Sequence, residues 1–118
     1  MSAVIKALPI VTVTTSGTAV AVSATNIENV LEVYISCPAT NTGNIMFGDS
    51  SVEAASGLSG AEIAKGTTLK IGYCGQYIDL KNLYIDALNN GDKAKISYLI
   101  MVQEKKWQEI NSFYKQLR

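Results

Sequence analysis

The chain has 118 residues, which is enough for one domain with a single core and too few for two. Ten Lys and Arg residues balance ten Asp and Glu residues, so the chain lacks the positive charge that concentrates nucleic acid or an anionic membrane, and its neutrality favours association of like chains. Its apolar runs are far shorter than the roughly 20 residues of a membrane-spanning helix, and residues 1–10 lack the apolar core of a signal peptide.

Two segments near the N-terminus, residues 10–14 and 18–23, are rich in Val and Thr, the composition of β-strands. The pair Ser16-Gly17 between them predicts a hairpin connection. Residues 30–37 then alternate between apolar and polar side chains, which predicts a half-buried strand. Its predicted inward positions are Leu31, Val33, Ile35 and Cys37, and its outward positions are Glu32 and Ser36.

A short apolar run at residues 44–48 lies between the turn-forming stretches 41–43 and 48–49, and it predicts another strand. Residues 49–66 contain few large apolar side chains and several glycines, so we expect mostly loop there. Within this loop, residues 61–64 predict a brief strand.

Three later segments alternate in the same way, at residues 67–74, 83–87 and 94–102. Asn90-Gly91 is the sharpest turn signal in the chain and predicts a tight type I′ hairpin that joins the last two segments. The predicted inward side chains are Leu69, Ile71, Tyr73, Leu83, Ile85, Ala87, Ala94, Ile96, Tyr98, Ile100 and Val102, and the outward ones include Lys70, Asp86, Lys95 and Ser97.

Seven strands, or eight with the brief one, therefore follow one another at intervals of about ten residues without intervening helices. This spacing predicts an all-β fold, an antiparallel β-sandwich or jelly-roll-like barrel of about 7–8 strands that occupies residues 1–102. The sequence leaves Greek-key and jelly-roll strand orders open.

The pattern changes after Val102, because residues 103–118 contain helix-forming side chains and neither Gly nor Pro. Apolar residues recur there every three or four positions, which predicts a short C-terminal amphipathic α-helix. A helix of this length is marginal in water, so its apolar face must dock either on the chain's own sandwich edge or on a neighbouring subunit. The predicted partner-binding residues on this face are Trp107, Ile110, Phe113, Tyr114 and Leu117.

The sequence contains no histidine, which excludes Ser–His–Asp and Cys–His catalysis and removes the commonest metal ligand. Cys37 and Cys74 lie far apart without a second pair, so we expect two reduced structural thiols and no zinc site. Gly57, Gly60 and Gly66 match neither a P-loop nor a dinucleotide-binding fingerprint. We therefore expect no catalytic residue, no metal, no cofactor and no enzymatic activity.

Four aspartates could pair as acid and base or gather calcium, but their spacings match no calcium loop, and local turns or strand alternation explain most of them. These are Asp49, Asp79, Asp86 and Asp92. Tyr77 and Tyr84 are candidates for an aromatic platform that binds a sugar, whereas alternation places Tyr73 in the core.

Residues 17–100 resemble a pattern of strand and turn residues found in small structural proteins of tailed bacteriophages, on the head or near the head–tail junction. The residues that carry it are Gly17-Thr18-Ala19-Val20, the strand at 30–37, residues 41–50, Asp79-Leu80, residues 83–87 and Asn90-Gly91-Asp92. The resemblance implies a β-sandwich virion component that binds a capsid or a neighbouring ring in many copies. It transfers no functional residue, and residues 103–118 lie outside it.

The leading hypothesis is a non-enzymatic virion structural protein, a capsid decoration or cement protein that binds the major capsid protein or neighbouring copies. We expect synthesis in the host cytoplasm, incorporation into the virion, capsid or neck proteins as partners, homo-oligomers, and no nucleic-acid, membrane or small-molecule partner. A head–tail connector or a head-fibre component is a near alternative. A carbohydrate-binding β-sandwich module that uses Tyr77 and Tyr84 is an alternative of another class.

Overall fold

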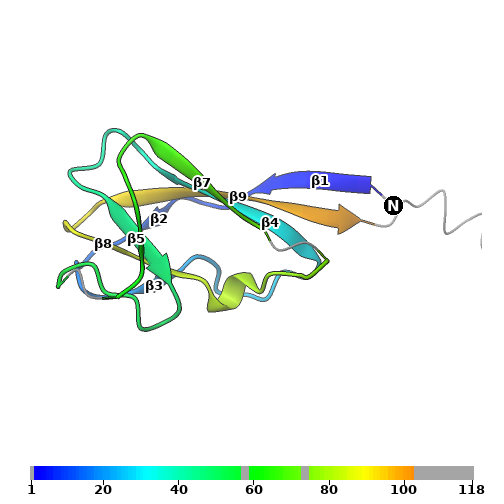
Figure 1. The fold of residues 1–118 in the computed structure, drawn as a ribbon, viewed down its shortest axis with the longest axis horizontal. Helices are drawn as coiled ribbons and strands as arrows, with labels where there is room; N and C mark the ends of the chain where they lie inside the picture. Colours follow the sequence, from blue (N-terminus) through cyan, green and yellow to red (C-terminus); the bar gives the residue numbers. More distant parts are fainter. Residues whose placement is uncertain (1, 57–58, 73–74, 103–118) are drawn as a thin grey trace, which may run out of the picture.

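The computed structural model describes residues 2–56, 59–72 and 75–102. Nine β-strands and one short 3-10 helix lie in these residues, and the strands form two antiparallel sheets that face each other (Figure 1). The predicted all-β fold with antiparallel sheets is therefore confirmed for this part of the chain. The predicted C-terminal helix at residues 103–118 lies outside the described residues.

The first sheet contains five strands. Its order is β1 (Ser2–Ala7), β9 (Lys93–Val102), β4 (Val30–Cys37) and β7 (Thr67–Gly72), and β2 (Val11–Thr12) pairs with the beginning of β9. β9, the last strand of the described residues, thus lies between β1 and β4 in this sheet.

β1 and β2 together form one interrupted strand along β9. Between them, the Leu8 N–H still donates to the Ile96 carbonyl at 2.9 Å, and the pairing resumes with Val11 opposite Ala94. The three intervening residues, 8–10, include Pro9, which has no N–H to donate to a sheet. The interruption therefore falls at the residue that cannot continue the ladder.

The second sheet contains four strands in the order β3 (Val20–Ala21), β8 (Tyr84–Ala87), β5 (Ile45–Gly48) and β6 (Ala61–Ile63). The 3-10 helix η1 (Leu80–Asn82) precedes β8 and contributes a fully buried side chain at its first residue.

One hydrophobic core fills the space between the sheets. Alternate residues of β4 and β9 supply one side of it, and β5 and β8 supply the other, as expected for strands that bury one face. The fully buried members include Val33, Ile35, Ile45, Leu80 and Ile85. The predicted alternation of residues 94–102 is confirmed by Ala94, Ile96 and Tyr98, which are all buried.

Two predicted hairpins are wrong. β2 belongs to the first sheet and β3 to the second, so the turn at Ser16-Gly17 carries the chain from one sheet to the other. The same holds for Asn90-Gly91, because β8 and β9 lie in different sheets. Both turns do contain a glycine in the left-handed region, with φ of 91° at Gly17 and 83° at Gly91, so the turn positions were predicted and the strand pairing was not.

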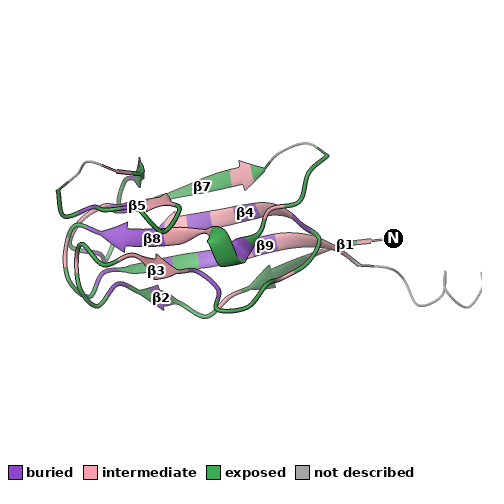
Figure 2. Cartoon of the chain, turned by 90° about the horizontal axis from the view of Figure 1, so that it is seen from below, coloured by how far each residue is buried: buried purple, intermediate pink, exposed green. Residues whose placement is uncertain are grey.

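A β-bulge near the start of β4 changes which side chains face inward. The register with β9 shifts between Val30 and Glu32, so Val30 is fully buried while the predicted inward residue Leu31 is only half-buried. The predicted inward residue Leu69 is also 37% exposed, because it lies on β7, an edge strand (Figure 2). Tyr73, Cys74 and the side chain of Val102 lie outside the described part.

Candidate interaction surfaces

Asp86 was predicted to face solvent, and this is wrong, because its side chain is completely buried. It does point away from the main core, but residues 52–54 fold over that face of the second sheet and form a small cluster with Met46. Its carboxylate accepts hydrogen bonds from the backbone N–H groups of Gly17 (3.1 Å to each oxygen), Ala54 (2.7 Å) and Ala87 (2.8 Å). Asp86 therefore holds two loops against β8.

Asp92 and Asn41 form a second polar cluster at the beginning of β9. The Asp92 carboxylate accepts from the backbone N–H groups of Thr42 (2.8 Å) and Gly43 (2.9 Å). The Asn41 amide donates to the Lys93 carbonyl (2.8 Å) and accepts from the Lys93 N–H (3.0 Å), as a neighbouring strand would. The polar atoms of both side chains are already hydrogen-bonded to backbone groups, so Asp92 and Asn41 stabilise the fold.

The other two aspartates stabilise turns. Asp79 is the N-cap of η1 and accepts from the Lys81 N–H at 3.0 Å. Asp49 accepts at its Oδ1 from the hydroxyl and the backbone N–H of Ser51. Within the described residues, no group of three or more Cys, Asp or Glu side chains gathers where it could hold a metal ion.

Hydrogen bonds from Ser51 lower the pKa of Asp49 below its ordinary 3.8. The bond from the Ser51 hydroxyl has the larger effect, and the bond from the Ser51 N–H has the smaller one. A lowered pKa in the folded state stabilises the protein above the ordinary pKa, and this contribution is lost as the pH falls through the folded value. An NMR titration of the carboxyl should therefore give a midpoint below the ordinary value, and Ser51→Ala should move it upward. An unchanged midpoint in Ser51→Ala would contradict this assignment.

The outer face of the first sheet carries an apolar strip at the end where β1 and β9 pair. In the register, Ile5 lies opposite Leu99 and Ala3 lies opposite Met101, so these four side chains share one face. We call them the outer strip. Ile5 is 66% exposed, Ala3 is exposed, and Leu99 and Met101 are half-buried.

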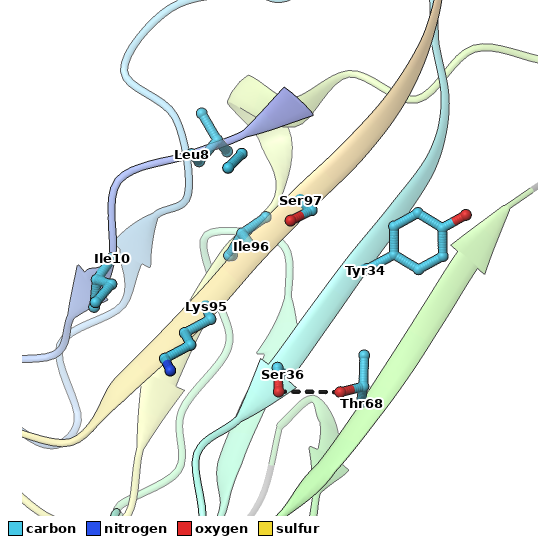
Figure 3. A pocket seen from close by; sticks show the side chains of 9 residues that line it. Leu8, Ile10, Tyr34, Ser36, Thr68, Lys95, Ile96 and Ser97 are labelled. Atoms are coloured by element: carbon cyan, nitrogen blue, oxygen red, sulfur yellow. Dashed lines mark hydrogen bonds between the residues drawn. The ribbon is translucent and has the colours of Figure 1, made fainter. Parts of the chain in front are cut away.

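A groove continues from the outer strip along the same face (Figure 3). Its volume is about 310 Å³, and Leu8 and Ile10 of the β1–β2 interruption border it on one side. Its other labelled side chains are Tyr34, Ser36, Thr68, Lys95, Ile96 and Ser97. Ser36 and Thr68 hydrogen-bond to each other at 3.0 Å, which closes the side next to β7.

Charge is sparse on this face. Along β1, β4, β7 and the part of β9 paired with β1 and β4, the outward charged residues are Glu32, Lys70 and Lys95. Glu32 accepts a hydrogen bond from the Tyr34 hydroxyl at 2.7 Å and lies 3.9 Å from the Lys70 Nζ. The hydrogen bond to Glu32 raises the pKa of Tyr34 above its ordinary 10.0, so this phenol adds no charge to the face at physiological pH. The face therefore offers few charges that a partner would have to desolvate.

A second hollow, of about 250 Å³, lies between two loops at the end of the molecule where β4 begins. Its lining residues are Asn26, Ile27, Glu28, Asn29, Tyr77, Ile78 and Asp79. Tyr77 is 63% exposed there. Tyr84, the other predicted sugar-binding tyrosine, instead packs against the Met46 cluster on β8, so the structure separates the two.

All five predicted partner-binding residues, Trp107, Ile110, Phe113, Tyr114 and Leu117, lie outside the described residues. The outer strip, the groove and the second hollow were not predicted from the sequence. The outer strip follows from the register of β1 with β9. The groove and the second hollow form where segments that are distant in sequence come together.

No protein-family model, no curated protein and no solved structure matches this chain. In the part that the structure describes, no helix is both long and apolar enough to cross a membrane. The proposals below therefore start from the sequence and from the contacts given above.

Proposed function

We propose that this chain is a non-enzymatic structural protein of a virus particle, a decoration or cement protein that associates with its own copies and with a capsid or neck protein. The strand order supports this proposal. Counted with β1 and β2 as one interrupted strand, the sheets run 1-8-3-6 and 2-7-4-5. This is the order of a jelly roll, an architecture that viral capsid domains use and that lectins share.

The outer strip is the observation that carries the proposal. Burying a side chain such as Ile5 contributes about 1.5–3 kcal/mol, and the sparse charge on this face keeps the desolvation cost of association low. Isolated exposed apolar residues are common on protein surfaces, but here Ile5 adjoins Leu99 and an apolar groove on one face.

The occupant that we assign to the strip is the apolar face of residues 103–118 from a neighbouring copy. β9 ends at Val102, which lies opposite Ser2 and directly follows Met101 of the outer strip. The apolar residues of 103–118 recur at helical spacing, and the chain has no net charge to oppose contact between copies. A head–tail connector or a head-fibre component would use the same face.

Sedimentation of the full chain across the micromolar range tests the assignment. We expect self-association, and Ile5→Lys should raise the dissociation constant at least about 10-fold, because it places a charge in the contact. The matched control is Leu88→Lys. Leu88 is 41% exposed and lies in the turn between β8 and the beginning of β9, whereas the outer strip lies at the other end of β9. This variant should leave association unchanged. A monomeric wild-type chain, or equal effects of the two variants, would contradict the proposal.

The viral context has its own test, since a decoration, connector or fibre gene lies among other particle genes. The genes beside the coding sequence should include one for a major capsid or portal protein. A neighbourhood of metabolic genes alone would contradict the viral part of the proposal and leave the association measurement unaffected.

A further inference from the structure

We propose that the hollow around Tyr77 binds one unit of a neutral carbohydrate. This goes beyond the assembly function, because the hollow and the outer strip share no residue. We call it the Tyr77 hollow, and its residues come from the segment before β4 and the segment before η1.

Backbone hydrogen bonds hold these two segments together without using the polar side chains of the rim. The Ile78 N–H donates to the Val30 carbonyl at 2.8 Å, which ties the Tyr77 segment to the first residue of β4. The Asn29 carbonyl accepts from the Met101 N–H at 3.4 Å, and Asn29 has a φ of 63°, a conformation that asparagine tolerates better than most residues. The hollow is therefore preformed at the end of the first sheet where β4 begins.

The chemistry of the lining matches a sugar ring. The exposed Tyr77 ring offers an apolar face for the C–H groups of a sugar, and the half-buried Ile27 and Ile78 add apolar surface beside it. Exposed amide and carboxylate side chains from Asn26, Glu28, Asn29 and Asp79 supply the donors and acceptors that hydroxyl groups need.

The charge of the lining narrows the ligand class. The lining contains carboxylates from Glu28 and Asp79 and no Lys or Arg, so it disfavours phosphorylated, sulfated or acidic sugars. One Asp79 oxygen accepts from the Lys81 N–H at 3.0 Å and the other from the Asn82 amide at 3.1 Å, which fixes the orientation of this carboxylate. The volume of about 250 Å³ is below that of most small-molecule pockets, so the hollow takes one sugar unit of a longer glycan.

NMR titration of the full-length, isotope-labelled chain with glucose, galactose, mannose, rhamnose and N-acetylglucosamine tests the inference. We expect at least one of these sugars to shift the resonances of residues 26–29 and 77–79 with a dissociation constant on the order of 1 mM, the affinity of a single shallow contact. N-acetylneuraminic acid, which is anionic, should bind more weakly than that sugar. The absence of shifts at these residues with all five neutral sugars at tens of millimolar would overturn the inference.

Variants of the ring then separate stacking from other contacts. Tyr77→Ala should weaken binding of the sugar about 10-fold, a loss of about 1.4 kcal/mol, because it removes the stacked ring, whereas Tyr77→Phe keeps the ring and should bind within about threefold. Tyr34→Ala on the outer face is the control and should bind as the wild type does. Equal binding by Tyr77→Ala and the wild type would overturn the inference. Self-association is measured separately, so failure of one proposal is distinguishable from failure of the other.

Discussion

Replacing Asp86 by alanine is expected to lower the free energy of unfolding by about 4 kcal/mol, a large part of the 5–15 kcal/mol typical of a domain. The substitution leaves the buried N–H groups of Ala54 and Ala87 without their acceptor and also removes the part-buried bond from the Gly17 N–H. Each buried donor without a partner costs about 1–3 kcal/mol. Urea unfolding followed by circular dichroism measures the change.

Asp49→Ala is the matched control for this experiment, because it removes the same carboxylate from an exposed turn. Water can replace the lost hydrogen bonds there, so its effect should stay below about 1 kcal/mol. If Asp86→Ala cost no more than Asp49→Ala, Asp86 would not be the support that holds the two loops.

Asn41→Asp is expected to cost about 3 kcal/mol at neutral pH, although the two side chains have nearly the same shape. The wild-type amide donates to the Lys93 carbonyl at 2.8 Å, and an ionised carboxylate would face that carbonyl without a proton and lie near Asp92. A protonated carboxyl can donate, so the loss should shrink as the pH is lowered toward about 4, where the introduced group gains its proton. Urea midpoints at several pH values check both the size and the sign.

Asn90→Asp provides the control for the same chemical change. Its Oδ1 accepts from the Ser16 N–H at 2.7 Å in an exposed site, and a carboxylate can accept that bond equally well. We expect a difference of less than about 0.5 kcal/mol from the wild type. A loss at Asn41 that equals the loss at Asn90, or that grows toward low pH, would contradict the pairing of Asn41 with Lys93.

Local periodicity predicted the strands well where one face of a strand is buried and the other is not. Residues 30–37 form β4 as predicted, and residues 94–102 all lie in β9. The hairpins failed because Ser16-Gly17 and Asn90-Gly91 specify that the chain turns, but not which sheet the next strand joins. β1 was missed because its alternation is interrupted and its side chains are mostly exposed.

The candidate surfaces were less predictable than the strands, for a related reason. The burial of Asp86 depends on residues 52–54, which are distant in sequence and cover the second sheet. The Tyr77 hollow likewise depends on the bond between Ile78 and Val30. Alternation gives the direction of a side chain, but not what covers that face.

The central place of β9 in the first sheet bears on how the chain reaches its fold. β4 and β1 both pair with β9, yet β9 ends only at Val102. Until β9 is synthesised, one backbone edge of β4 has no paired strand, and β1 lacks the strand with which it pairs. Pairing between sequence-distant strands makes folding slow and leaves strand edges exposed in the meantime. Completion of the first sheet therefore waits for β9, and the nascent chain is most prone to aggregate between the synthesis of β4 and that of β9.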